Sequence, residues 1–461
     1  MYPPRSEKLK TKKQEKQRRL NRIWLMVNLT LITLIIVLGA YFYLGERTQQ
    51  GSPVKNPSGV QSNPSGVTNG QGGQNTGLTS PKAQPENESE ASDNLPTGDG
   101  VAEAEPNPDE LELVNEPGSP IGGVRDDELL IHFAGDTIFS SKVAEKLEKE
   151  GYDYPYKYVQ DLFQKDDLTI LNLETPVTKG GQAAKNKQFV FKSSPKALAS
   201  MEKAGVDAVN LANNHILDHG ISGLRDTIKY LNQYKILHAG AGNNSQDAYA
   251  PAYIERKGIR IALFGFSRVM PESSWAAGKT QAGVASVYQP DLAIKAIKAA
   301  RKNADVVLVV AHWGKERTTV LEKHQKDLAH SFIDAGADLV VGGHPHVLQG
   351  LEKYKGKWIA YSTGNFIFTK SKDPKTWETA VFEVKCTRKG ACRMQLIPYR
   401  TELGQPVPMN KQEGSKLLRE IQSYSPGVKI GSNGEVVSLG AKKTGGFGTF
   451  PAEERIVAFT E

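Results

Sequence analysis

Between residues 128 and 370, short apolar runs alternate with segments whose apolar residues recur at helical spacing, and this alternation limits the chain to an α/β fold. The runs are almost continuously apolar, which is typical of strands buried on both faces of a sheet. We expect strands at 129–134, 169–173, 208–212, 260–266, 306–311, 339–341 and 358–362. We expect helices between them at 142–150, 195–204, 222–234, 291–302 and 321–335.

The C-terminal part of the chain has a different pattern. It predicts a β-hairpin at 379–386 and 392–398, a helix at 411–424, and a second hairpin within 428–439 around an Asn-Gly turn. The only two cysteines, Cys386 and Cys392, flank the five-residue turn of the first hairpin, which places them opposite each other for a disulfide. Two reduced thiols are the alternative, because a register shift of one residue would separate their faces.

Ile23–Leu44 is a run of 22 residues without a charge, long enough to span the ~30 Å hydrocarbon core of a membrane. A signal peptide has a shorter apolar region that ends in small residues, whereas this run ends in bulky aromatic residues and Leu44. Residues 1–22 carry nine Lys and Arg against two Glu, which predicts a cytoplasmic arm. We therefore expect a single-pass protein of the cell membrane, with a cationic arm at 1–22, a transmembrane anchor at 23–44 and the large domain outside the cell.

Residues 45–125 are rich in Gly, Pro, Ser, Asn and acidic residues and contain too few apolar residues for a core, so we expect a disordered stalk. The remaining chain, 125–461, has a net charge of +9, with acidic residues interspersed among the Lys and Arg. This distribution does not predict nucleic-acid binding. It fits an acidic partner such as an anionic polymer, although many globular domains carry a similar charge without any such role.

Residues that bind metals or transfer protons recur just after the predicted strands. They are Asp136; Glu174; Asn214, His215 and Asp218; His312 and Glu316; and His344 and His346. In open α/β sheets, ligands bind outside the carboxyl ends of the strands, where these side chains would meet. Histidines and carboxylates without a thiolate suit Zn, Mn or Fe. The sequence therefore predicts a metal-competent site at this edge of the sheet.

The motifs that contain these residues resemble a known family. They read Gly-Asp136, Asn172-Leu-Glu174-Thr-Pro, Asn-Asn214-His215-x-x-Asp218, His312-Trp-Gly-x-Glu316, Gly-His344-Pro-His346 and Tyr361-Ser-Thr-Gly-Asn365. Their order resembles the poly-γ-glutamate capsule synthesis family of the CapA/PgsA type over about residues 128–400. The family's domain is similar to calcineurin-like metallophosphoesterases, which implies a sandwich of two sheets flanked by helices. We expect this domain at 126–400, with 401–461 as its C-terminal α/β extension.

The resemblance also implies roles for the site residues. Glu174 would bridge two metal positions; Asn214, His312 and His344 would complete one position, and Asp136 and His346 would supply the other. His215 matches a histidine that stabilises or protonates a leaving group, and we expect Asp218 and Glu316 to be catalytic with it. The superfamily has a histidine where this chain has Ile138. We therefore expect one divalent metal (Mn, Zn or Fe) bound tightly, and a second bound weakly or absent.

Two functions follow from the resemblance. The first is a metal-dependent, phosphoesterase-like hydrolase that acts in synthesis or export of an anionic capsule or cell-surface polymer. The second is a non-enzymatic, polymer-binding accessory subunit of a membrane synthase or export complex, with a degenerate metal site. The retained ligand set favours the hydrolase, and Ile138 favours the accessory subunit. In both cases we expect partners among the membrane subunits that make and export the polymer.

Overall fold

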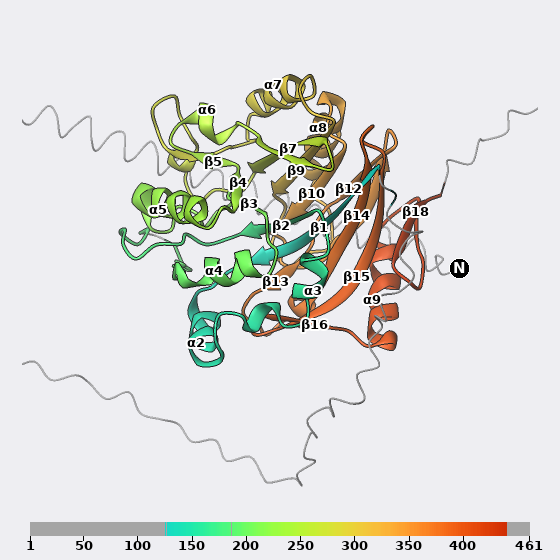
Figure 1. Cartoon of the computed structure of the whole chain (residues 1–461), viewed down its shortest axis with the longest axis horizontal. Coiled ribbons are helices and arrows are strands. Elements are labelled where there is room, and N and C mark those ends of the chain that lie inside the picture. Colours follow the sequence, from blue (N-terminus) through green and yellow to red (C-terminus); the bar gives the residue numbers. More distant parts are fainter. Residues whose placement is uncertain (1–124, 126, 186, 440–461) are drawn as a thin grey trace, which may run out of the picture. The chain divides into compact units, whose positions relative to one another are not determined.

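Two β-sheets that face each other, with helices on their outer surfaces, make up the computed structural model of this chain (Figure 1). The structure describes residues 125, 127–185 and 187–439, all within the unit Gly100–Glu461. The predicted arm, the anchor and almost all of the predicted stalk lie outside the described residues, as does 440–461. Within the described ranges, no helix has both the length and the apolar character needed to cross a membrane.

The first sheet has ten strands, with β1 near its middle. Its order is β17-β18-β15-β14-β1-β2-β3-β4, while β13 pairs with β1 and β16 pairs with β15. Strands β1 to β4 are parallel, and β14 runs antiparallel to β1. The strands are β1 (Glu128–Thr137), β2 (Leu168–Leu173), β3 (Ala208–Asn210), β4 (Leu237–Ala239), β13 (Asn365–Ile367), β14 (Glu378–Thr387), β15 (Cys392–Glu402), β16 (Gln405–Pro408), β17 (Val428–Ile430) and β18 (Glu435–Ser438).

The second sheet has six strands in the order β11-β12-β10-β9-β7-β6. Its four central strands are parallel, and the outer strands pair antiparallel to their neighbours. The strands are β6 (Ala252–Arg256), β7 (Ile259–Ser267), β9 (Val306–His312), β10 (Leu339–Gly343), β11 (Leu351–Tyr354) and β12 (Lys357–Ala360). A separate short pair joins β5 (Ala241–Gly242) and β8 (Gly283–Val284).

The helices connect the strands and cover the outer faces of the sheets. The α-helices are α2 (Ser141–Glu150), α3 (Gln160–Phe163), α4 (Lys196–Lys203), α5 (Gly220–Gln233), α6 (Ser245–Ala248), α7 (Asp291–Ala300), α8 (Lys323–Ala335) and α9 (Lys411–Ser423). Three 3₁₀ turns are η2 (Tyr154–Tyr156), η3 (Ser273–Trp275) and η4 (Pro374–Trp377). Helices α7 and α8 lie over the second sheet in Figure 1, and α2, α4 and α5 accompany the first.

Strand β9 shows why the predicted strands are almost continuously apolar. Leu308 and Val310 belong to the core between the two sheets, which also contains Phe133 of β1. Val307 and Val309 point the other way, into the layer that packs against α7 and α8. Because both faces of the strand are buried, no position along it favours a polar residue, and each buried side chain stabilises the fold by roughly 1.5–3 kcal/mol.

The structure confirms the α/β class and the predicted elements of residues 128–370, most of them within about two residues of their expected ends. Two strands are shorter than predicted: β12 ends at Ala360 rather than at residue 362, and β3 ends at Asn210 rather than at residue 212. The side chain of Asn210 explains the early end of β3, because its Oδ1 accepts a hydrogen bond from the backbone N–H of Ala212 (3.0 Å) and turns the chain out of the sheet. Short strands such as β4 and β13 were not predicted.

The C-terminal predictions are also confirmed. Strands β14 and β15 form the first hairpin, α9 follows, and β17 and β18 form the second hairpin. Cys386 and Cys392 are direct partners in the β14–β15 register and form a disulfide, which decides between the two alternatives that the sequence left open. Both cysteines are buried in the core between the sheets.

Removing this disulfide should cost little stability, because it closes a short loop. We expect the double substitution Cys386→Ala and Cys392→Ala to lower the free energy of unfolding by about 2–2.5 kcal/mol, measured by urea denaturation. Thiol labelling of the denatured, unreduced wild-type chain should find no free thiol, and labelling after reduction should find both. Two free thiols before reduction would contradict the pairing.

Candidate metal centre

The carboxyl ends of parallel strands from both sheets meet at one edge of the molecule. In the first sheet, Asp136 lies near the end of β1, and Glu174 follows β2 directly. In the second sheet, His312 is the last residue of β9 and pairs in register with Gly343, the last residue of β10. His344 comes next, so the two sheets bring their polar strand ends to the same place.

The turn after β10 has an uncommon backbone conformation. Both His344 (φ 94°) and His346 (φ 57°) have positive φ, a region that side chains other than glycine rarely adopt. The preceding Gly343 permits the close approach to β1, since a Cβ atom there would lie only 2.7 Å from Oδ1 of Asp136. The backbone N–H of His344 donates to Oδ2 of the same aspartate (3.2 Å). Strain of this kind is concentrated at functional sites in proteins.

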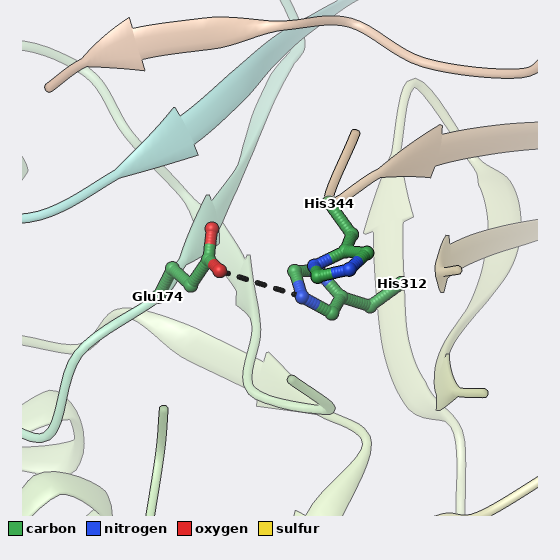
Figure 2. Close-up of side chains that lie close together, drawn as sticks. All are labelled: Glu174, His312 and His344. Atoms are coloured by element: carbon green, nitrogen blue, oxygen red, sulfur yellow. Dashed lines mark ion pairs between the residues drawn. The ribbon is translucent and has the colours of Figure 1, made fainter. Parts of the chain in front are cut away.

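A first group of side chains that could hold a metal ion consists of Glu174, His312 and His344. One ligand atom from each lies within 4.8 Å of the other two, and all three side chains are buried. Figure 2 shows the carboxylate of Glu174 directed toward the two imidazole rings, with 3.4 Å between its Oε1 and Nε2 of His312. The same Nε2 lies 2.7 Å from Oδ1 of Asn214, so the amide reaches the same point.

Asp136, Glu174 and His346 form a second group with the same spacing. Nδ1 of His346 lies 3.1 Å from Oδ2 of Asp136 and 2.9 Å from Oδ1 of Asn365. Glu174 is therefore shared between the two groups. Ile138, where the resemblance expected a further imidazole, has a fully buried hydrocarbon side chain and offers no donor atom.

The residues of these groups fit a divalent metal. Neither carboxylate oxygen of Glu174 has a hydrogen-bond partner within the described ranges, although both are buried, and Nδ1 of His344 is in the same state. Buried polar atoms are normally paired, because leaving one unpaired costs about 1–3 kcal/mol and more for a charged group. A cation between Glu174 and the two histidines would satisfy these atoms at once.

The electrostatics of the group are consistent with a strongly negative site. Burial lowers the pKa of His346, but the carboxylates of Glu174 and Asp136 outweigh this effect and raise it to about 9. Burial and the neighbouring His312 and His346 rings hold the pKa of His344 well below its usual range. The carboxylates of Glu174 and Asp136 therefore favour a positive charge beside them, which a metal cation would also supply.

His215 and Asp218 form a pair beside these groups. Nδ1 of His215 lies 2.7 Å from Oδ2 of the fully buried Asp218, which leaves Nε2 of the ring available. The ring of Phe191 stacks on His215 with 4.4 Å between centroids. Glu316, the third residue expected to be catalytic, lies in the exposed loop after β9, and its carboxylate comes close to His344 and His346.

Comparison with known proteins identifies the family. The family model described as bacterial capsule synthesis protein PGA_cap matches residues 130–370, more than half of the chain. The chain belongs to the PGA_cap family. This result confirms the resemblance that the motifs indicated.

Relatives of this PGA_cap member include two proteins from Bacillus. The PGA biosynthesis protein CapA of Bacillus subtilis is 32% identical over 304 residues, which cover 65% of this chain and 79% of the relative. The capsule biosynthesis protein CapA of Bacillus anthracis is also 32% identical, over 63% of this chain and 72% of its own length. Among solved structures, TT1561 of Thermus thermophilus aligns with a TM-score of 0.34 at 10% identity, covering 59% of this chain and 99% of that one, a likeness too weak to bear on the fold.

One charged side chain of this PGA_cap site, Lys187, was not predicted from the sequence. Nζ of Lys187 donates to the backbone carbonyl of Asn214 (2.5 Å), forms an ion pair with Asp218 and lies 2.9 Å from Nδ1 of His215. Burial lowers the pKa of Lys187 even though Asp218 opposes the shift. Lys187 lies in a segment without helix or strand, where no spacing pattern predicts contacts, so the sequence carried no signal for this role.

Two asparagines of the family motifs also support the site without having been expected as site residues. Nδ2 of Asn172 donates to Oδ1 of Asp136 (2.7 Å) and lies 3.2 Å from Nδ1 of His312. Asn365 of β13 pairs in register with Asp136 and contacts His346. They orient the side chains that face the candidate metal positions, and their place in the motifs is the signal that pointed to them.

The Lys187–Asp218 pair should be measurably coupled, because removal of one partner leaves a buried charge. We expect Lys187→Met to lower the free energy of unfolding by about 3 kcal/mol. Adding Asp218→Asn to that variant should lower the free energy of unfolding by less than the same substitution does in the wild-type chain. A double-mutant cycle in urea should therefore give a coupling energy of about 1–3 kcal/mol. Strictly additive costs would show that the pair does not stabilise the fold.

Proposed function

We propose that this protein acts in the synthesis or export of an anionic capsule or cell-surface polymer of the poly-γ-glutamate type, through a metal-dependent hydrolase site. The observation that carries the proposal is the buried carboxylate of Glu174, which has no hydrogen-bond partner within the described ranges and faces histidines from the other sheet. The membership in a capsule synthesis family supports the polymer. The names of the two Bacillus relatives, which refer to PGA and capsule biosynthesis, agree with it.

The first metal position has four donors, Glu174, Asn214, His312 and His344, and the second has Glu174, Asp136 and His346. These residues suit Mn, Zn or Fe. A divalent metal held there would polarise the oxygen that is attacked and lower the pKa of a bound water to about 7. Two facing sheets with helices outside and a site at the strand ends also match the arrangement expected of calcineurin-like metallophosphoesterases, which supports a phosphoester as the bond that is cleaved.

The chain's own residues supply proton transfer and orientation. Asp218 accepts a hydrogen bond from Nδ1 of His215, which fixes the ring and leaves Nε2 to donate a proton to a leaving oxygen. The stacked Phe191 restricts rotation of the same ring. Lys187 holds Asp218 from the other side and links it to the backbone of Asn214, so that the proton donor and a metal ligand keep a fixed separation.

A non-enzymatic role is the second candidate, and two observations favour it. Ile138 leaves the second metal position without one donor. A relative from Mycobacterium tuberculosis, 32% identical over 212 residues that cover 44% of this chain and 55% of that protein, bears the name probable polyglutamine synthesis accessory protein. In this role the chain would bind nascent polymer and act as a subunit beside a membrane synthase and export proteins.

Metal content tests the hydrolase proposal. The purified full chain should retain at least one equivalent of Zn or Mn by elemental mass spectrometry. His312→Ala should remove one equivalent, because His312 belongs only to the first group and alanine offers no donor. His330→Gln is the matched control, since His330 lies on α8 outside the ligand groups and pairs with Glu352.

The same variants separate the two candidate functions in cells. If the site is catalytic, a strain that produces only the His312→Ala protein should lose its polymer, whereas the His330→Gln strain should keep it. A wild-type chain that binds no metal when Zn and Mn are supplied, together with normal polymer in the His312→Ala strain, would contradict the hydrolase and leave the accessory role.

We also propose that residues 23–44 anchor the protein in the cell membrane with the described domain outside. The uncharged run and the cationic residues before it support this orientation. Protease added to intact cells should digest the domain, while a tag placed before residue 22 stays protected until the cells are opened. Protection of the domain, or a released form that begins near residue 45, would contradict the anchor.

A further inference from the structure

Compared with the family pattern, the second metal position of this chain lacks one donor, because Ile138 stands where a histidine is expected. A carboxylate from another part of the chain approaches this position. Glu316 lies four residues after the end of β9, in the loop that follows His312. One carboxylate oxygen of Glu316 and one ring nitrogen each of His344 and His346 lie within 4.8 Å of one another. His346 also belongs to the group with Asp136 and Glu174, so Glu316 reaches the second position through a histidine that this position already uses.

The loop that carries Glu316 has a defined backbone. Gly314 adopts φ 87° against Gln325, where an added Cβ atom would come within 2.9 Å of the glutamine side chain. Arg317 also has positive φ (56°), and its backbone N–H donates to the carbonyl of Pro345 (2.7 Å), between the two histidines. The residue after Glu316 is therefore fastened to the histidine turn, and Gly314 before it lies close to Gln325 of α8.

The carboxylate of Glu316 is an unused donor beside the histidine turn. His344 is a ligand of the first position; it is only 4% exposed, and its Nδ1 has no hydrogen-bond partner among residues that the structure describes. The carboxylate of Glu316 makes no hydrogen bond or ion pair within the same ranges, although its charge acts on His346 and Lys187. A carboxylate without a partner of its own, beside a histidine that already belongs to the second position, is an arrangement that a divalent cation there would complete.

We propose that Glu316 is a metal ligand that closes the second position from the solvent side, in place of the donor that Ile138 does not supply. This inference rests on the proposed function and replaces the catalytic role that the motifs implied for Glu316. With Glu316 included, the centre has three carboxylates, from Asp136, Glu174 and Glu316. Two divalent cations exceed their charge by one, which leaves the loaded site positive for an anionic substrate. The second cation is the one nearer to solvent, because Glu316 is exposed whereas the ligands of the first position are buried.

Manganese binding to the full chain tests this assignment. After chelation and reloading with Mn²⁺, the wild-type protein should hold two equivalents and give the electron paramagnetic resonance spectrum of two exchange-coupled ions that share Glu174. Glu316→Gln keeps the size of the side chain but removes its charge. We expect this substitution to lower the affinity for the second manganese ion by roughly 10-fold or more. Mutation of residues that only hydrogen-bond to metal ligands already lowers metal affinity by about 10–100-fold. The spectrum should become that of an isolated ion.

Glu145→Gln is the matched control, because it removes the same charge from an exposed position of α2 outside the ligand groups. It should keep both equivalents. Equal manganese affinity and equal spectra for the wild type and Glu316→Gln would overturn the role of Glu316 while leaving the proposed function intact. A wild-type chain that binds no manganese, zinc or iron at all would overturn the metal centre itself, and the assignment of Glu316 with it.

Discussion

The carboxylate of Glu174 is the constraint on which the rest of the site depends. It is fully buried, and neither of its oxygens has a hydrogen-bond partner within the described residues. The effective cost of burying an uncompensated ion is several kcal/mol, so a fold that keeps one must compensate it nearby. His312 and His346 approach this carboxylate from the other sheet and hold its pKa below the ordinary value, against the effect of burial, which raises it. A cation between these groups would compensate the same charge more completely.

The fold explains why such a cluster forms where it does. Asp136 and Glu174 come from the first sheet, and His312, His344 and His346 come from the second. The apolar residues that face each other between the sheets fix the separation of the two sets of strand ends. The site is therefore a property of the sheet packing, and Asn172 and Asn365 orient the ligands through hydrogen bonds.

Much of this arrangement could be predicted from the sequence, because its signals are local. Buried parallel strands such as β9 are read from their unbroken apolar runs, and polar residues at their carboxyl ends must lie at one edge of the sheet. Short strands such as β4 and β13 contain only three residues each and carry no period that can be recognised. Strand β3 was predicted too long because a side-chain hydrogen bond, which no apolar pattern reveals, ends it.

The contacts across the site could not be predicted in the same way. Which ligands group together is decided by how the two sheets pack, and the family resemblance supplied that information for Glu174 and its neighbours. Lys187 reaches Asp218 from a segment without regular structure, and Glu316 reaches His346 only because the loop after β9 is fastened to Pro345. Both contacts depend on tertiary geometry that neither composition nor spacing records.

We propose that the strand ends of the two sheets together hold a divalent metal at Glu174. Anomalous diffraction from a crystal of the metal-loaded protein, collected on both sides of the manganese or zinc absorption edge, tests it most directly. We expect an anomalous peak within bonding distance of Glu174, His312 and His344. Density for the three side chains with no peak between them, or a peak bound elsewhere on the chain, would contradict it.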